Sequence, residues 1–244
     1  MTLLAMSEVS KSYRDGLRPR LVLDRVSFET DAGETIGVLA ARLAGKTTLL
    51  KIAAGLELPD SGSVLWGSHD LARMSNDRRA SFRRRQGIAL ASCDWRPVAS
   101  IPVVTHVATP LYSDGLKMSE AERCAHRALE WAEASHLGHR TTDRLGVSDR
   151  VRVELARALV REPRLLLVDE PALLPRPSDA WEFFALIHEL PKQFGLALVI
   201  ASEEVTALRG AHRVMSLDGG LYSTDTRRKV VELRPGRGAR PDAS

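Results

Sequence analysis

The chain has 244 residues, of which 44% are hydrophobic and 27% are charged, and its formal net charge is +4 at pH 7. This composition is typical of a globular protein with a substantial core, and it excludes a chain that is disordered throughout. The longest apolar runs, such as residues 197–201, are far shorter than the roughly 20 residues that a membrane-spanning helix needs. The first residues have neither a basic start nor a long apolar stretch, so we expect no signal peptide and a cytoplasmic protein.

Cysteine and arginine are the residue types that could indicate special chemistry. Cys93 and Cys124 have neither metal-ligand spacing nor a redox motif, which favours buried or incidental thiols. Arginine gathers in two stretches, 78–86 and 227–240. Such clusters can bind nucleic acid or an anionic membrane surface, but these two lack an interleaved aromatic platform for bases. We therefore interpret them as a solvated helix face and a loose tail.

The first half of the chain predicts strands followed by helices. Strand patterns cover 3–13, 21–30 and 34–40, and the last of them ends at a glycine-poor loop. A helix begins at Lys46 and ends at Gly55, before a turn at 59–62. A short strand follows at 62–67, then a basic helix from Asp77 and a strand at 87–91. Residues 100–161 are helical almost throughout, with Ser119 as the predicted N-cap of one helix.

The second half alternates buried strands with a helix. The pattern predicts strands at 164–169 and 195–202, a helix at 178–194 and a hairpin at 212–224. Strands that alternate with helices predict an α/β fold with a parallel sheet covered on both faces. The tail, 227–244, is rich in Arg, Pro and Gly and is predicted to be disordered.

A phosphate-binding loop is predicted at the start of the helix that begins at Lys46. In the pattern G-x-x-x-x-G-K-[ST], backbone N–H groups and a helix N-terminus surround phosphates, a lysine reaches their oxygens and a hydroxyl binds Mg²⁺. Gly45, Lys46 and Thr47 fill the last three positions, whereas Ala40 stands at the first glycine. Alone, this tripeptide is weak support, since Gly-Lys-Thr at a helix start is common by chance.

A second motif strengthens the prediction. The run "LLLVDEP" puts Asp169 and Glu170 at the carboxyl end of a buried strand, where parallel-sheet proteins bind ligands. Such an aspartate can hold Mg²⁺ through its water shell, and the glutamate can orient or deprotonate an attacking water. The alternative is a surface turn after a core strand. That alternative does not explain why the acidic pair follows the lysine loop in the order that phosphate-loop enzymes use.

Together these segments resemble the nucleotide-binding subunit of ATP-binding cassette (ABC) transporters over almost the full length of the chain. The resemblance rests on "EVSKSY", "LDRVSFETDAGETIGVLA", "AGKTTLLKIAAGLELPDSGSV", "DRVRVELARALVREP" and "RLLLVDEP". The segment "DLARMSNDRRASFRRRQGIAL" is most similar to the subfamily of lipoprotein-release and macrolide-export systems. The resemblance as a whole implies an α/β fold with a parallel sheet core of the P-loop NTPase type, an antiparallel β subdomain and an inserted helical lobe. The implied domain is 1–226, with the lobe at about 92–161.

The resemblance also implies a ligand, a metal and partners. ATP and Mg²⁺ would bind in the cytoplasm, on a subunit that dimerises with a like or unlike copy and docks on an integral-membrane permease; no nucleic acid is expected. Tyr13 would stack on adenine, and Glu170 would be catalytic. Thr47 and Asp169 would hold Mg²⁺, the latter through water. The implied nucleotide-binding residues are Tyr13, Ala44, Gly45, Lys46, Thr47, Thr48 and Asp169.

Several positions depart from the family pattern. Ala91 stands where the family has a glutamine that senses Mg²⁺ and the attacking water, and Glu203 stands where it has a histidine that contacts the γ-phosphate. Alanine can neither ligate nor donate, and a carboxylate facing a phosphate inverts the sign of the interaction. Loss of one preorganised stabilising group typically slows a reaction by roughly 10²- to 10³-fold. We therefore predict ATP binding with weak hydrolysis.

The signature motif, usually L-S-G-G-[QE], reads Leu-Gly-Val-Ser-Asp at 145–149. In the family it closes over the γ-phosphate of ATP held by the opposite subunit. Val147 at a glycine position opposes close approach and any positive φ, while Ser148 is displaced from the usual hydroxyl. Arg176 replaces an aspartate that communicates between sites. Leu43 in the phosphate loop is strained if its φ is positive.

Three functions stay open on the sequence alone. The first is a transporter ATP-binding subunit with weak hydrolysis, whose permease groove would lie beside Ala91, where Trp95 and Pro97 supply apolar surface. The second is a catalytically inactive relative that acts as a scaffold or regulator of a permease complex. The third, motivated by the arginine clusters, is a soluble cassette protein that binds nucleic acid, although a second cassette in the chain is lacking.

Overall fold

The fold is that of a computed structural model, in which residues 2–15, 18–92, 100–171, 174, 176–217 and 221–222 are described. The predicted disordered tail, 227–244, lies outside the described residues. So do Trp95 and Pro97 of the predicted docking stretch.

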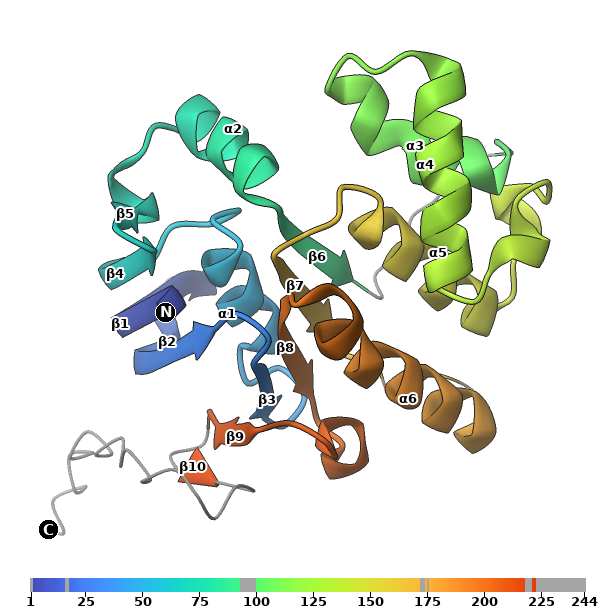
Figure 1. The fold of residues 1–244 in the computed structure, drawn as a ribbon. Helices are drawn as coiled ribbons and strands as arrows, with labels where there is room; N and C mark the ends of the chain where they lie inside the picture. The colour runs from blue at the N-terminus through green and yellow to red at the C-terminus, as the bar shows by residue number, and fades with distance from the viewer. Residues whose placement is uncertain are drawn as a thin grey trace, which may run out of the picture.

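A six-stranded sheet forms the centre of the molecule (Figure 1). Its order is β10-β9-β3-β8-β7-β6, and β9, β3, β8, β7 and β6 run parallel to one another. The strands are β3 (Thr35–Leu39), β6 (Ile88–Ser92), β7 (Leu165–Asp169), β8 (Ala197–Ser202), β9 (Arg213–Ser216) and β10 (Leu221–Tyr222). Every residue of β7 and β8 is buried, as expected for strands with both faces covered. The last two strands pair antiparallel, which confirms the predicted hairpin.

A second, antiparallel sheet has the order β2-β1-β4-β5. Its strands are β1 (Thr2–Asp15), β2 (Arg18–Asp31), β4 (Ser61–Trp66) and β5 (His69–Asp70). The first three correspond to predicted strands, whereas the two-residue β5 was missed because it is too short to show a period. Leu4 and Met6 alternate with more exposed neighbours along β1 and face the core.

Six α-helices complete the described architecture: α1 (Lys46–Ala53), α2 (Asn76–Gln86), α3 (Val103–Ser113), α4 (Met118–Trp131), α5 (Val147–Leu159) and α6 (Pro177–Phe194). Four short 3₁₀ helices lie at Leu71–Arg73, Ser135–Leu137, Thr142–Arg144 and Val205–Leu208. Helices α3, α4 and α5 contact one another and form a group on one side of the molecule, away from the antiparallel sheet (Figure 1). This group corresponds to the predicted helical lobe.

One predicted helix boundary is wrong. Ser119 is not an N-cap, because α4 begins at Met118 and its N-cap is Lys117. The backbone of Lys117 is extended, and its carbonyl already accepts from the N–H groups of Glu120 and Ala121. Ser119 therefore lies inside the first turn, where its hydroxyl is not in the capping position.

Alternate residues of the buried strands face two different apolar clusters. Leu165 and Leu167 of β7 join a cluster with α1 and the antiparallel sheet. Leu166 and Val168 join the cluster that contains the lobe helices and α6. Because successive side chains of a strand point to opposite faces, β7 contributes to both clusters. Within the described residues, no helix is long and apolar enough to cross a membrane.

Candidate functional site

The parallel sheet brings three loops together at the carboxyl ends of its strands. Strand β8 lies between β3 and β7, and in register Leu39 pairs with Ser202 while Asp169 pairs with Ala201. All three strands run in the same direction, so the loops that follow them meet at their carboxyl ends. Because neighbouring strands are about 4.8 Å apart, the loop after β3 and the loop after β7 are within reach of a long side chain.

The loop after β3 requires glycine at position 45. Gly45 has a φ of 96°, and a Cβ there would lie 2.8 Å from Val22 Cγ1 and 2.9 Å from the Val22 carbonyl oxygen. Leu43 also has a positive φ, 65°, which confirms the backbone strain predicted for it. Its side chain is 75% exposed, and its carbonyl accepts from the Arg20 guanidinium at 3.3 Å.

Lys46, the first residue of α1, is buried and has three close oxygen partners. Its Nζ lies 2.9 Å from each of the carbonyl oxygens of Ala40 and Ala41. It also forms an ion pair of 3.0 Å with Glu170 Oε2. The lysine loop and the acidic pair predicted from the sequence are therefore in direct contact. A phosphate that reached Lys46 would compete with the Glu170 carboxylate for it.

Thr47 and Asp169 form the second contact between the two motifs. The Thr47 hydroxyl donates to Asp169 Oδ2 at 2.7 Å, while Asp169 Oδ1 is buried without a hydrogen-bond partner among the described residues. Burial raises the pKa of the Asp169 carboxyl, although the Thr47 hydrogen bond acts in the opposite direction. A hydroxyl beside a carboxylate oxygen with an unused lone pair fits the hard oxygen ligands that Mg²⁺ prefers.

Glu170 is held in place by groups at the end of β8 and at the start of α1. Its Oε1 accepts from the Ser202 hydroxyl at 3.0 Å and from the Glu203 N–H at 3.1 Å. Its own backbone has a φ of 50°, and its N–H donates to the Ala201 carbonyl at 2.8 Å. Together with the ion pair to Lys46, these contacts fix both carboxylate oxygens. The hydroxyl of Ser202 was not predicted, because nothing in "LVIAS" indicates that one serine points at the acidic pair.

These groups line a cavity of about 360 Å³ at the carboxyl edge of the sheet. Its lining residues are Tyr13, Arg20, Val22, Arg42, Leu43, Gly45, Lys46, Thr47, Thr48, Asp169 and Glu170. Arg20 and Arg42 were missed by the sequence analysis, since neither belongs to a phosphate-binding pattern. Ala44 is not among the lining residues, and its N–H donates to the Ala41 carbonyl at 3.2 Å. Its role at the nucleotide stays a prediction.

Tyr13 lies at the rim of this cavity, near the end of β1. Its hydroxyl donates to Glu57 Oε1 and lies 3.3 Å from the Thr48 hydroxyl, while 39% of the residue is exposed. The hydroxyl is anchored on the protein side, which leaves ring surface at the cavity. This arrangement suits a stacking platform, and stacking on adenine stays a prediction.

The two positions at which the chain lacks a catalytic residue of the family pattern have different structural surroundings. Ala91 is buried in β6 opposite Val168 and packs in the apolar cluster of the lobe side, so its position offers no polar group. Glu203 is exposed and does not line the cavity. Its N–H holds Glu170 instead. The expectation that its carboxylate faces a phosphate therefore has no support in this geometry.

The signature region begins α5, as predicted from the motif. Gly146 is the N-cap, and Val147 is 48% exposed with a φ that is not positive, so the objection based on positive φ does not apply to it. The Ser148 hydroxyl donates to Asp179 Oδ2 at 2.5 Å, and Arg176 pairs with the same carboxylate at 3.1 Å. Ser148 is thus engaged within its own chain.

Comparison with known proteins identifies the family. A family model described as "ABC transporter" matches residues 23–173. The chain belongs to the ABC transporter family. The lipoprotein-releasing system ATP-binding protein LolD of Chromohalobacter salexigens is 32% identical over 223 residues, which are 91% of this chain and 94% of that protein. The methionine import ATP-binding protein MetN of Rhizobium johnstonii is 32% identical over 199 residues, which are 81% of this chain and 54% of that protein.

A solved structure confirms the fold of this ABC transporter family member. The dimeric ATP-binding cassette MJ0796, bound to ADP and Pi in a post-hydrolysis state, superimposes with a TM-score of 0.78. The sequence identity is 21%, and the match covers 87% of this chain and 93% of that one. The predicted α/β architecture, with a parallel core, an antiparallel sheet and a helical lobe, is therefore confirmed.

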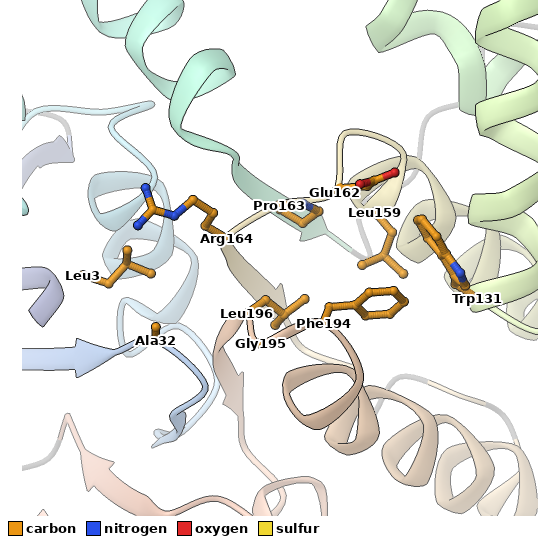
Figure 2. Close-up of a pocket in the computed structure, with 10 residues that line it drawn as sticks. All are labelled: Leu3, Ala32, Trp131, Leu159, Glu162, Pro163, Arg164, Phe194, Gly195 and Leu196. Carbon is orange, nitrogen blue, oxygen red and sulfur yellow. The ribbon is translucent and has the colours of Figure 1, made fainter. Parts of the chain in front are cut away.

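A second hollow, of about 220 Å³, opens at the opposite, amino-terminal edge of the parallel sheet. Arg164 and Leu196, which immediately precede β7 and β8, line its middle. Figure 2 shows Trp131 and Phe194 together at one end of it. The centroids of these two rings are 4.9 Å apart, and the rings are arranged edge to face. Its lining combines apolar side chains with the charged residues Glu162 and Arg164.

Proposed function

We propose that this protein is the ATP-binding subunit of an ABC transporter, which binds Mg-ATP at the carboxyl-edge cavity and hydrolyses it slowly. The observation that carries the proposal is the meeting of Lys46, Thr47, Asp169 and Glu170 at one edge of the sheet. The two halves of this site are more than a hundred residues apart in the chain, so the fold alone brings them together.

In the proposed complex, Lys46 releases Glu170 and takes phosphate oxygens, while the N–H groups at the start of α1 surround the phosphates. The residues that contribute to these phosphate contacts are Gly45, Thr47 and Thr48, and Ala44 is included because of the family pattern. The ring of Tyr13 supports the base. Thr47 and Asp169 hold Mg²⁺, which when bound would neutralise charge that develops on the phosphates.

Glu170 is the proposed catalytic residue, and its surroundings explain slow turnover. After Lys46 leaves, Glu170 Oε1 still accepts from the Ser202 hydroxyl and the Glu203 N–H, and these contacts make the carboxylate less able to take a proton from water. The side chain at position 91 offers no polar group, and the Glu203 carboxylate does not line the cavity. The chemical step therefore depends on Glu170 alone among the groups that the family pattern places around the attacking water.

The proposed partners follow from the relatives, whose names describe a lipoprotein-releasing system and methionine import. We infer an integral-membrane permease partner, a dimer of nucleotide-binding subunits, a place at the cytoplasmic face of the membrane, and no nucleic acid. The proposed domain is 1–226, with the lobe at about 92–161. The scaffold alternative receives no support, since both relatives are named ATP-binding proteins.

The test of turnover is phosphate release by the purified chain at saturating Mg-ATP, compared with the Glu170→Gln variant. We expect slow release that disappears in the variant, since an amide cannot take the proton from water. Equal release from both proteins would reject Glu170 as the catalytic residue. If the wild type binds Mg-ATP but releases no phosphate, the hydrolysis part of the proposal is wrong and the binding part stands.

A further inference from the structure

A carboxylate outside the nucleotide-binding motifs contacts the aromatic ring at the rim of the carboxyl-edge cavity. Glu57 lies in the turn between α1 and β4, and its Oε1 accepts from the Tyr13 hydroxyl. The two residues are 44 positions apart in the chain, so the fold brings them together. The Glu57 side chain is 25% exposed and does not line the cavity. Any effect of Glu57 on a bound ligand therefore passes through Tyr13.

The single proton of the Tyr13 hydroxyl determines the direction of its two hydrogen bonds. The phenol oxygen lies 3.3 Å from the Thr48 hydroxyl in addition to its contact with Glu57. An ionised carboxylate can only accept, so the phenol donates to Glu57 and the Thr48 hydroxyl donates to the phenol oxygen. Partial burial and the hydrogen bond to Glu57 raise the pKa of Tyr13, so the phenol keeps its proton at neutral pH.

Of these two contacts, the one to Glu57 is the stronger. Hydrogen bonds to an ionised group are roughly twice as strong as those between neutral groups. The contact to Thr48 joins two neutral hydroxyls at a longer distance. Because Thr48 lies in the first turn of α1, the chain of hydrogen bonds connects the ring to the phosphate end of the same cavity.

The turn that carries Glu57 is itself fixed to its neighbours. Asp60 Oδ2 accepts from the Ser12 N–H at 2.7 Å, and Asp60 Oδ1 accepts from Lys11 Nζ at 3.0 Å. The Glu57 N–H donates to the Lys51 carbonyl of α1 at 3.2 Å. These contacts hold the turn against both β1 and α1. The Glu57 carboxylate is therefore a fixed acceptor at the position of the phenol.

The ring of Tyr13 needs such an anchor because much of it is exposed. The residue is 39% exposed near the end of β1, and it lines the cavity. A side chain that becomes ordered only when a ligand binds reduces the affinity for that ligand. Two torsion angles place a tyrosine ring, so a hydrogen bond at the tip of the ring restricts both of them. The ring is therefore ordered before a ligand arrives.

We propose that Glu57 is a positioning residue, which holds the Tyr13 ring in the orientation that stacks on a nucleobase. The inference rests on the proposed function, in which this ring supports the base of ATP, and it adds the residue that preorganises the contact. Glu57 does not touch the nucleotide. Its contribution to binding therefore requires both the Tyr13 hydroxyl and a ligand that has a base.

The charge of Glu57 has the opposite effect on binding. A carboxylate near a polyphosphate repels it, so a purely electrostatic role predicts tighter binding when Glu57 is replaced. That tightening would apply to ATP and to inorganic tripolyphosphate alike. The positioning role predicts weaker binding, and for ATP alone. The two roles are therefore separated by the sign of the effect and by its dependence on the base.

The test measures the binding of Mg-ATP and of Mg-tripolyphosphate to the full chain by calorimetry. The variants are Glu57→Ala, Tyr13→Phe, the two combined, and Glu57→Gln, whose amide oxygen can still accept from the phenol. The matched control is Glu29→Ala, which makes the same substitution at an exposed position of β2 that pairs with Ala5, at the other end of β1. Thermal unfolding verifies that each variant is folded. If Glu57→Ala is not, Tyr13→Phe removes the same hydrogen bond and keeps the ring.

We expect Glu57→Ala and Tyr13→Phe each to weaken Mg-ATP binding by roughly two- to tenfold, which corresponds to the ordering of one side chain on binding. The double variant should be no weaker than the single variants, because both substitutions remove one interaction. Glu57→Gln should recover most of the affinity, and Glu29→Ala should match the wild type. Tripolyphosphate should bind to all of these proteins alike.

Three results would overturn the proposal: unchanged Mg-ATP affinity in Glu57→Ala, additive losses in the double variant, or a loss of tripolyphosphate binding as large as that of Mg-ATP. Tighter binding of both ligands to Glu57→Ala would also overturn it, since the carboxylate would then act by repulsion. Absence of Mg-ATP binding to the wild type would reject the proposed function together with the inference. Wild-type binding that is unchanged in Glu57→Ala would reject the inference alone.

Discussion

Leu43→Gly should stabilise the protein, although it removes a side chain. Leu43 has a φ of 65°, a region that costs a non-glycine residue about 1 to 2 kcal/mol. Glycine removes this strain but increases the conformational entropy of the unfolded chain, which offsets about 0.4 to 1 kcal/mol. The side chain is 75% exposed, so little buried apolar surface is lost. The net gain in free energy of unfolding is therefore roughly 0.5 to 1 kcal/mol.

The measurement is thermal unfolding of the nucleotide-free protein. For a chain of this size, the expected gain raises the midpoint by roughly 1 to 4 °C. Leu43→Ala is the control, because alanine removes the same exposed side chain but keeps the Cβ that causes the strain. If Leu43→Gly is no more stable than Leu43→Ala, strain at this position is not a significant part of the stability, and the reasoning is refuted.

Three further predictions concern the same loop and two buried titratable groups. Gly45→Ala should lower the unfolding midpoint and abolish Mg-ATP binding, because its Cβ would lie 2.8 Å from Val22 Cγ1; unchanged binding in calorimetry would show that the loop adapts. Burial raises the pKa of Asp169, so Mg-dependent ATP affinity should decrease as the pH is lowered, and a pH-independent affinity would argue against Asp169 as a magnesium ligand. Burial lowers the pKa of His188 from its usual value near 6.5, so the unfolded state takes up the proton first and stability should fall as the pH drops below that value. His188→Gln should flatten this dependence in thermal unfolding, and an equal slope in both proteins would contradict the assignment.

The sequence was sufficient for the parts of the site that depend on local chemistry. A lysine at the start of a helix and an acidic pair after a buried run are both visible in short windows, and parallel strands necessarily bring them to one edge. Strain at Leu43 was predicted on the condition of a positive φ, and the structure shows that φ. These features follow from residue order and backbone sterics alone.

Side-chain partners were much less predictable, because they depend on tertiary packing. The sequence showed Ser148 only as a displaced signature hydroxyl, whereas in the structure Asp179 at the start of α6 accepts from it. Glu203 was expected to face the nucleotide, yet its backbone N–H, and not its carboxylate, contacts the site. Arg20 reaches the phosphate loop from another sheet, a contact that no spacing in the sequence encodes.

The arginine cluster of α2 illustrates the same limit. It lacks an interleaved aromatic platform for bases, which favoured a solvated helix face. In the structure, Arg83 and Arg84 of this cluster line one hollow together with Arg157 and Arg161. A helical pattern describes one element, whereas charge excess in a pocket arises from the sum over several elements.

The central claim is tested most directly by the equilibrium binding of Mg-ATP to the wild type and to Lys46→Ala, measured by calorimetry with and without Mg²⁺. The account predicts magnesium-dependent binding to the wild type, and a loss of at least about tenfold in the variant, because a charged hydrogen-bond donor to the phosphates is removed. No binding to the wild type, or equal binding to a folded Lys46→Ala variant, would contradict the assignment of this cavity as the ATP site.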